Sequence, residues 1–231
     1  NYMVTPADSQ CQRIIIQRIR EVYPDHGFIA EEGDSGRMFK RPPVGEPAVW
    51  WVIDPIDGTH NFIHGIPIFA VSVAAMLDGV PIVGVIFHPA TDAMFTAIRG
   101  GEAQLDGRHI VVGDDEIGPL TSVGLDSHFD DPLPPWVSEL IRRSRFRNFG
   151  TTALHLAYIA KGGLVAAAMS TPKLWDIAAG AVIAQAAGAV VTNWSGEAIF
   201  PVDLDAYAGQ AFRVLAGNQK GHAGLLKTMQ A

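Results

Sequence analysis

The stretch Val49-Trp50-Trp51-Val52-Ile53-Asp54-Pro55-Ile56-Asp57-Gly58-Thr59 decides which fold this chain can adopt. Its first five residues form a continuous apolar run, which is typical of a strand buried on both faces. The run stops where two aspartates, three positions apart, flank a proline. We predict a buried strand over 49–53, a pair of carboxylates at its end, and a helix that begins at His60 or Asn61.

Helix and strand signals alternate along the rest of the chain. Thr5, Pro6 and Asp8 mark a helix start, in which Thr5 is the N-cap and Asp8 completes a capping box. We expect helices over 5–22, 136–144, 152–161 and 176–187 and at the C-terminal end, strands over 28–30, 68–77, 80–87, 93–98, 146–149, 164–169, 189–192 and 212–216, and loops over 33–48 and 126–135. This alternation favours layered sheets covered by helices, an α+β arrangement.

Length and composition indicate one globular unit of enzyme size. The chain has 231 residues, of which 48% are hydrophobic, and this is enough to bury a sizeable core. Its 24 Gly and 15 Pro are spread between apolar runs, which indicates many short turns. We therefore treat residues 1–231 as a single unit with two subregions, about 1–135 and 136–231.

Charge and cysteine content exclude several classes of protein. A net charge of -7 repels polyanions, so we expect no nucleic-acid partner, and we interpret the arginines of 142–147 as a solvated helix face. Cys11 is the single cysteine, so no internal disulfide can form; this fits a reducing compartment, and we expect a cytoplasmic protein. No apolar run reaches the ~18 residues of a membrane span and no signal peptide is visible, so we expect no membrane association.

Asp54 and Asp57 together predict a bound cation. Two carboxylates in one small volume repel each other, and a hard divalent metal between them removes that cost. Oxygen ligands without a Cys or His cluster favour Mg²⁺ or Mn²⁺ over Zn²⁺. The backbone N–H groups of Gly58 and Thr59 suit a phosphate, and metal ions beside a phosphate are what hydrolysis of its ester requires. Taken alone, these residues also fit a capped turn with two solvated aspartates.

The other acidic positions have ordinary explanations when each is taken alone. Asp176, in the stretch Leu174-Trp175-Asp176-Ile177-Ala178-Ala179-Gly180, fits the N-cap of a helix. Glu31 and Glu32 fit an exposed acidic turn after a short strand. Asp8 is explained by its capping box. The order in which these positions occur along the chain points beyond these separate explanations.

Taken together, the motifs resemble the inositol monophosphatase family. The resemblance rests on Ala30-Glu31-Glu32-Gly33, on Asp54 to Thr59 followed by Asn61-Phe62, and on Trp175-Asp176 with Ala179-Gly180; Val4 to Asp8 and Gly150-Thr151 add to it. Order and spacing match across nearly the whole chain. The helix that usually precedes these residues in the family is expected to be missing here.

The resemblance implies both a fold and an activity. The fold would be a layered αβαβα sandwich like that of fructose bisphosphatase, and the protein is expected to be a homodimer. The activity would be hydrolysis of a phosphate monoester of a small metabolite by metal-activated water. Two or three Mg²⁺ ions, or Mn²⁺ in their place, would be bound, and lithium would inhibit.

The resemblance also implies a role for each site residue. Glu31, Asp54 and the backbone carbonyl of Ile56 would hold the first metal ion, and Asp54, Asp57 and Asp176 the second, while Glu31 would support a weaker third. Thr59, paired with Asp8 or Glu31, would orient the attacking water. Substrate contacts would come from Asp57, Gly58, Thr59, Gly150, Thr151, Thr152 and Asp176.

Position 169 departs from the family pattern. Inositol-specific members carry an acidic residue seven positions before the aspartate of the second motif, where it contacts sugar hydroxyls, and this chain has Met169. A thioether does not accept strong hydrogen bonds, so the leaving group would be less hydroxylated, or Lys173 would reach it. Met169 also fits a plain core position in a strand. We interpret the nearby His60 and His64 as capping or packing residues.

Several functional interpretations stay open. Histidinol phosphate, fructose bisphosphate and nucleotide phosphates are alternatives to inositol phosphate within the family. A phosphatase that passes through an aspartyl phosphate uses two aspartates one residue closer together than Asp54 and Asp57. A catalytically silent metal-binding interaction protein would keep the fold, although the complete set of carboxylates argues against it.

Overall fold

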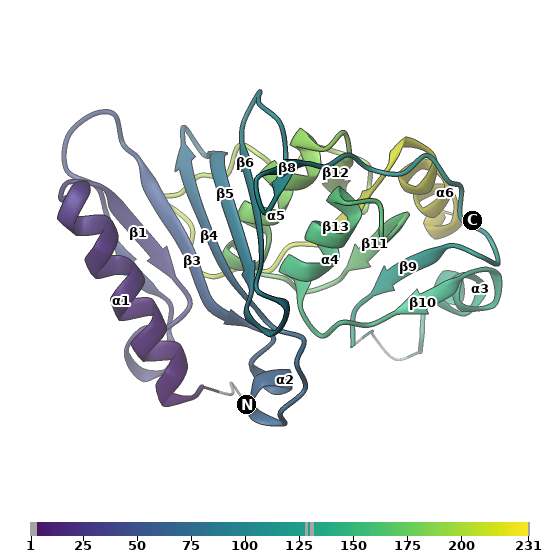
Figure 1. Cartoon of the computed structure of the whole chain (residues 1–231), viewed down its shortest axis with the longest axis horizontal. Coiled ribbons are helices and arrows are strands. Elements are labelled where there is room, and N and C mark those ends of the chain that lie inside the picture. The colour runs from purple at the N-terminus through teal and green to yellow at the C-terminus, as the bar shows by residue number, and fades with distance from the viewer. Residues whose placement is uncertain (1–3, 128, 130–131, 231) are drawn as a thin grey trace.

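The computed structural model describes residues 4–127, 129 and 132–230 and shows five layers of helices and sheets (Figure 1). Helix α1 (Pro6–Val22) covers the outer face of the first sheet. Helices α4 (Thr152–Ala160) and α5 (Leu174–Ala186) lie between the two sheets, and α3 (Pro135–Arg143) and α6 (Gln219–Gln230) cover the second sheet. The predicted αβαβα sandwich is therefore confirmed.

The first sheet has eight strands and is antiparallel except at one pair. Its strands lie in the order β2 (Phe39–Arg41), β1 (Gly27–Ala30), β3 (Trp50–Asp57), β4 (Ala70–Leu77), β5 (Val80–His88), β6 (Ala93–Ile98), β7 (Gln104–Leu105) and β8 (Arg108–His109). β1 and β3 run parallel, so both end at the same edge of the sheet. The short helices α2 (Thr59–Ile63), η1 (Asp34–Gly36) and η2 (Pro89–Thr91) lie in its connections.

The second sheet has five strands of mixed direction. Their order is β10 (Arg145–Arg147), β9 (Ser122–Leu125), β11 (Ala166–Met169), β13 (Val214–Gly217) and β12 (Val190–Asn193). β9 runs parallel to both of its neighbours, whereas β13 is antiparallel to β11 and β12. β9 and β11 therefore deliver the residues that follow them to the same edge of the sheet.

The middle helix layer explains why α4 and α5 are apolar on all sides. One face of this layer packs against Trp50, Val52 and their neighbours in the first sheet, and the other packs against the second sheet. A helix buried on every side needs apolar residues around its whole circumference. A Cβ atom at Gly180 would lie 2.5 Å from the Leu156 side chain, so this glycine lets the two helices approach closely. Among the described residues, no helix combines the length and hydropathy needed to span a membrane.

In the first half of the chain, three predicted helix, strand or loop boundaries differ from those in the structure. The predicted loop 33–48 contains η1 and strand β2, whose short polar sequence gives no periodic signal. The strand predicted over 49–53 continues through Asp57, because its pairing with β4 resumes at that residue. Helix α2 begins at Thr59, one residue before the predicted start.

The rest of the chain contains more strands than the sequence predicted. The short strands β7, β8 and β9 were not predicted, because segments of two to four residues are too short to show alternation. Helix α5 begins at Leu174, not at Asp176. Residues 128, 130 and 131 of the predicted loop 126–135 lie outside the described residues.

Candidate metal and phosphate site

Asp54 and Asp57 lie at the carboxyl end of β3 and face the same volume. Residues three apart on a regular strand point to opposite faces of the sheet. Here the pairing of β3 with β4 is irregular between these two aspartates, and this irregularity turns both side chains to one side. Both are buried, and the backbone N–H of Ile56 donates to Asp54 Oδ1 at 3.0 Å. The local backbone therefore creates the carboxylate pair.

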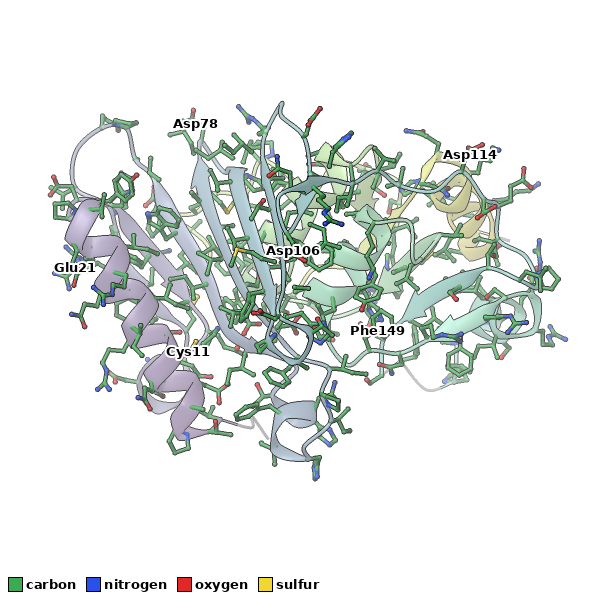
Figure 2. All side chains as sticks on the ribbon, viewed as in Figure 1. Cys11, Glu21, Asp78, Asp106, Asp114 and Phe149 are labelled. Atoms are coloured by element: carbon green, nitrogen blue, oxygen red, sulfur yellow. The ribbon has the colours of Figure 1, made fainter. Side chains whose placement is uncertain are left out.

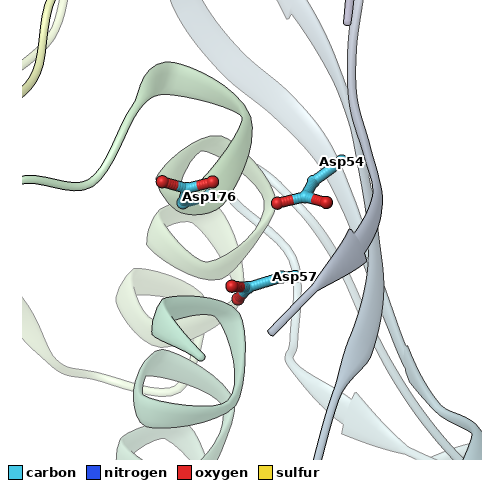
Figure 3. A group of neighbouring side chains, drawn as sticks. All are labelled: Asp54, Asp57 and Asp176. Atoms are coloured by element: carbon cyan, nitrogen blue, oxygen red, sulfur yellow. The ribbon is translucent and has the colours of Figure 1, made fainter. Parts of the chain in front are cut away.

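Asp176 reaches the same volume from the first turn of α5. One ligand oxygen from each of Asp54, Asp57 and Asp176 lies within 4.8 Å of the others (Figure 3). The backbone N–H of Lys173 donates to Asp176 Oδ2 at 2.6 Å. Asp176 is therefore the third residue of the helix and not its N-cap, a position where the helix dipole also favours a carboxylate.

Glu31 completes the group from the neighbouring strand. It follows β1, and its backbone N–H donates to the Ile53 carbonyl of the parallel strand β3 at 3.2 Å. Its carboxyl group shares a hydrogen bond with Asp54, and Asp54 shares another with Asp176. A hydrogen bond between two carboxyl groups requires a proton, so without a cation these contacts hold only while one partner of each pair is protonated.

Burial raises the pKa of all four carboxyl groups, and repulsion between them adds to this effect. The pKa of Glu31 rises to about 8 through burial and the charge of Asp176, and that of Asp57 also rises to about 8 for the same two reasons. Burial raises the pKa of Asp176 to about 6, and burial followed by the charge of Glu31 holds the pKa of Asp54 well above its usual range. Four oxygen donors that repel each other fit a hard divalent cation such as Mg²⁺.

Thr151 holds Asp57, a contact that the sequence did not predict. The Thr151 hydroxyl and the backbone N–H of Ala153 both donate to Asp57 Oδ2 at 2.6 Å. Thr151 is also the N-cap of α4 and Thr152 is its first residue, so the start of this helix lies against the carboxylate cluster. Thr151 and Thr152 were predicted as substrate contacts, and that prediction stays untested.

Asp8 and Thr59 lie together, as one of the two predicted pairings requires. The Thr59 hydroxyl lies 3.0 Å from the Ile56 carbonyl oxygen and 3.4 Å from Asp8 Oδ1. Asp8 also completes the predicted capping box, because its Oδ2 accepts from the backbone N–H of Thr5. Its capping role and its contact with the site therefore coexist. Gly58, directly before α2, has a φ of 95°, a conformation that favours glycine.

A cavity of about 190 Å³ opens beside the cluster. It is lined by Asp57, Asp126, Ser127, Gly150, Thr151, Thr152, Thr171, Pro172 and Asp176. Asp126 was not predicted; it follows β9, and its Oδ2 accepts from the backbone N–H and hydroxyl of Ser170, which follows β11. The sequence signal that could have identified Asp126 is its position directly after the apolar run 123–125. A larger groove, about 1150 Å³, runs along α1, but none of the four clustered carboxylates lines it.

The side chains of the other candidate residues have partners outside the carboxylate cluster. Met169 is fully buried in the core with Leu156 and Ile177. The fold therefore supports the interpretation of Met169 as a core residue of its strand. The Lys173 ammonium donates to the Gly209 carbonyl at 2.7 Å. His60 on α2 and His64 directly after it are exposed, and their ring centroids lie 4.5 Å apart.

The chain is similar over nearly its whole length to known proteins. The profile of the Inositol monophosphatase family matches residues 1–231. A "Nus factor SuhB" of Vibrio cholerae is 35% identical over 204 residues, which cover 85% of this chain and 73% of that protein. A "Fructose-1,6-bisphosphatase/inositol-1-monophosphatase" of Thermotoga maritima is 35% identical over 196 residues, which cover 84% and 73%.

The similarity extends to solved structures. The crystal structure of the extragenic suppressor protein suhB from Bartonella henselae matches with a TM-score of 0.86 at 29% identity, and the match covers 98% of this chain and 84% of that one. The proteins that this chain resembles therefore carry two kinds of name, one for an enzyme and one for a Nus factor.

Proposed function

Because this chain belongs to the inositol monophosphatase family, we propose that it hydrolyses a phosphate monoester of a small metabolite with the help of bound Mg²⁺. The observation that carries the proposal is the convergence of Asp54, Asp57 and Asp176, whose ligand oxygens lie within 4.8 Å of one another. Family membership alone does not carry it, because a relative named as a Nus factor is equally similar.

The metal ligands in this proposal are the four carboxylates and one carbonyl. Glu31, Asp54 and the carbonyl of Ile56 would hold one ion, and Asp54, Asp57 and Asp176 would hold a second. Bound Mg²⁺ supplies neutralisation of the phosphate charge and a more acidic water. The raised pKa values of Glu31 and Asp57 support this assignment, because a divalent cation offsets the repulsion that causes them in part.

The chain's own residues would orient the ester and the water. The Thr59 hydroxyl donates toward Asp8 and the Ile56 carbonyl, so its lone pairs can accept a hydrogen bond from a water and fix the direction of that water. Gly58 and Thr59 present backbone N–H groups at the start of α2, next to the carboxylates. These groups would bind the phosphate oxygens, and burial of the site would limit access of bulk water.

The test is phosphate release from a panel of monoesters with and without Mg²⁺. The panel contains inositol phosphate, fructose bisphosphate, histidinol phosphate and a nucleotide monophosphate, which are the substrates that the family resemblance leaves open. Asp54→Asn should abolish turnover while the protein stays folded. Asp114→Asn is the matched control, since Asp114 is an exposed aspartate paired with Lys220. Turnover by Asp54→Asn at the wild-type rate would overturn the proposal.

The name of the Vibrio relative favours a second candidate, a Nus factor role without turnover. Such a protein would keep the fold and bind Mg²⁺ at the same carboxylates. Mg²⁺ binding without phosphate release from any ester of the panel would support this candidate over the enzyme. We further propose that the protein is a cytoplasmic homodimer and that Li⁺ inhibits it. Gel filtration tests the dimer, and phosphate release measured with and without Li⁺ tests the inhibition.

A further inference from the structure

Asn61 joins the two halves of the chain beside the carboxylate cluster. It lies on α2 and is 9% exposed. Its Nδ2 donates to the carbonyl of Ile68 and to the carbonyl of Phe149, both at 2.7 Å. Since both partners are acceptors, the amide nitrogen must be the atom that faces them. One side chain therefore fixes a loop of the first half and a turn of the second half; Phe149 is labelled in Figure 2.

The turn that begins at Phe149 carries the partners of Asp57. Gly150 has a φ of 66°, and a Cβ atom there would lie 2.9 Å from Asn61 Nδ2, so the turn packs directly against the amide. The next residue, Thr151, donates its hydroxyl to Asp57 Oδ2, and Ala153 donates its backbone N–H to the same oxygen. The backbone of residues 149–151 thus links the hydrogen bond of Asn61 to the hydrogen bonds that hold the Asp57 carboxylate.

The opposite side of the Phe149 peptide is held as well. His155 is buried, and its Nε2 accepts from the Phe149 backbone N–H at 3.2 Å. Asn148 Oδ1 accepts from the backbone N–H of Gly150 at 2.8 Å. Asn61 is nevertheless the one of these three residues that comes from the first half of the chain. Asn61 therefore helps to place the turn relative to Asp57, which lies four residues before Asn61 in sequence.

We propose that Asn61 is a positioning residue for the metal site. It fixes the turn from Phe149 to Thr151, and through Thr151 and Ala153 it holds the Asp57 carboxylate in the direction that a cation needs. This inference rests on the proposed function, because it takes Asp57 as a metal ligand. Loss of a group that orients a metal ligand commonly weakens metal binding by about 10–100-fold. Asn61 acts one step farther away, so we expect the lower end of that range.

The variant Asn61→Asp tests the inference at constant side-chain size. It replaces the amide nitrogen with a carboxylate oxygen that faces two carbonyl oxygens, so both hydrogen bonds are lost. The readout is the midpoint of the Mg²⁺ binding isotherm, measured without substrate by isothermal titration calorimetry. We expect it to increase about tenfold. A second variant, Gly150→Ala, places a methyl group against Asn61 from the second half of the chain. We expect it to raise the Mg²⁺ midpoint by the same factor, so it tests the inference even if Asn61→Asp does not fold.

Asn218→Asp is the matched control. Asn218 is also buried and bridges two backbone groups, the carbonyl of Asp115 and the N–H of Gly221, but it lies at the start of α6 and not at the carboxylates. It should lower Tm and leave the Mg²⁺ midpoint within about twofold, because it orients no ligand.

The outcomes separate this inference from the proposed function. A Mg²⁺ midpoint that stays within twofold in Asn61→Asp or in Gly150→Ala would overturn the inference and leave the proposed function intact. An equal shift in Asn218→Asp would overturn it as well, because the effect would then be general destabilisation. Absence of any Mg²⁺ response in the wild-type protein would overturn the proposed function and this inference together.

Discussion

The metal-free protein is expected to lose stability as the pH rises from 6.5 to 8. In the folded protein the pKa of Glu31 and that of Asp57 are raised to about 8, whereas both groups titrate near pH 4 in an unfolded chain. Between these values the folded protein keeps protons that the unfolded chain has released, so a rise in pH favours unfolding. The window begins at 6.5 because above this pH His155, whose pKa burial lowers to about 4, is uncharged in the folded protein and increasingly uncharged in the unfolded chain, so its contribution is small.

The magnitude follows from proton linkage. One group with this shift lowers the free energy of unfolding by about 1.4 kcal/mol per pH unit. Over this window Glu31 or Asp57 alone would contribute about 1.6 kcal/mol, because each is half deprotonated by pH 8, and the two together about 3 kcal/mol. In a chain of this length 1 kcal/mol corresponds to about 2–4 °C in Tm. We therefore expect Tm to fall by about 5–15 °C in EDTA.

Mg²⁺ should remove this loss, because it binds the deprotonated carboxylates and competes with their protons. A ligand at about 100 times its Kd adds about 2.7 kcal/mol of stability, and this gain should be larger at pH 8 than at pH 6.5. Differential scanning calorimetry gives the Tm under all four conditions, at pH 6.5 and at pH 8, each in EDTA and in Mg²⁺. The double variant Glu31→Gln with Asp57→Asn should flatten the metal-free profile. A metal-free Tm that is constant or rises over this range would refute the reasoning.

Three further predictions concern single residues. Met169→Glu should lower the free energy of unfolding by about 3–5 kcal/mol, because the new carboxylate would be buried among apolar side chains. It should not raise turnover of inositol phosphate. Denaturant titration measures the stability, and the ester panel measures the turnover. Relative to His155→Gln, the wild-type protein should lose about 1.4 kcal/mol of unfolding free energy per pH unit as the pH falls from 6.5 towards 4, because only the unfolded chain protonates His155 there. Denaturant titration of both proteins at pH 6.5 and 5 measures this loss. An equal change of unfolding free energy in the two proteins would contradict it. Gly180→Val should cost about 1–3 kcal/mol, since its side chain would collide with Leu156, and a Tm equal to that of the wild-type protein would contradict this packing argument.

The sequence could predict most of the fold because its strongest signals are local. The capping box at Thr5 and Asp8, the apolar run before Asp54 and the two adjacent strands predicted over 68–77 and 80–87 each depend on a few neighbouring residues, and each appears in the structure. The strands that were missed, among them β2 and β9, are short and gain their hydrogen bonds from neighbours distant in sequence. Such strands are determined by tertiary pairing, which local patterns do not contain.

The candidate site was predictable as a set of residues but not as a geometry. The motifs identified Glu31, Asp54, Asp57 and Asp176, and the structure brings the three aspartates together with Glu31 beside Asp54. The irregular pairing that turns Asp54 and Asp57 to one side depends on β4 and could not be read from β3. The hydrogen bonds from Thr151 to Asp57 join residues 94 positions apart, so no local signal exists for them.

The backbone explains how the chain tolerates so many buried carboxylates in one place. Each aspartate of the cluster accepts one backbone N–H: Asp54 from Ile56, Asp57 from Ala153 and Asp176 from Lys173. Two of these donors belong to the starts of α4 and α5, where the helix dipole also favours negative charge. These hydrogen bonds oppose the rise in pKa and fix one oxygen of each side chain, so the other oxygens are already oriented before a cation arrives. Preorganisation of this kind lets a metal site bind without further ordering of the chain, since the folding of α4 and α5 has already supplied it.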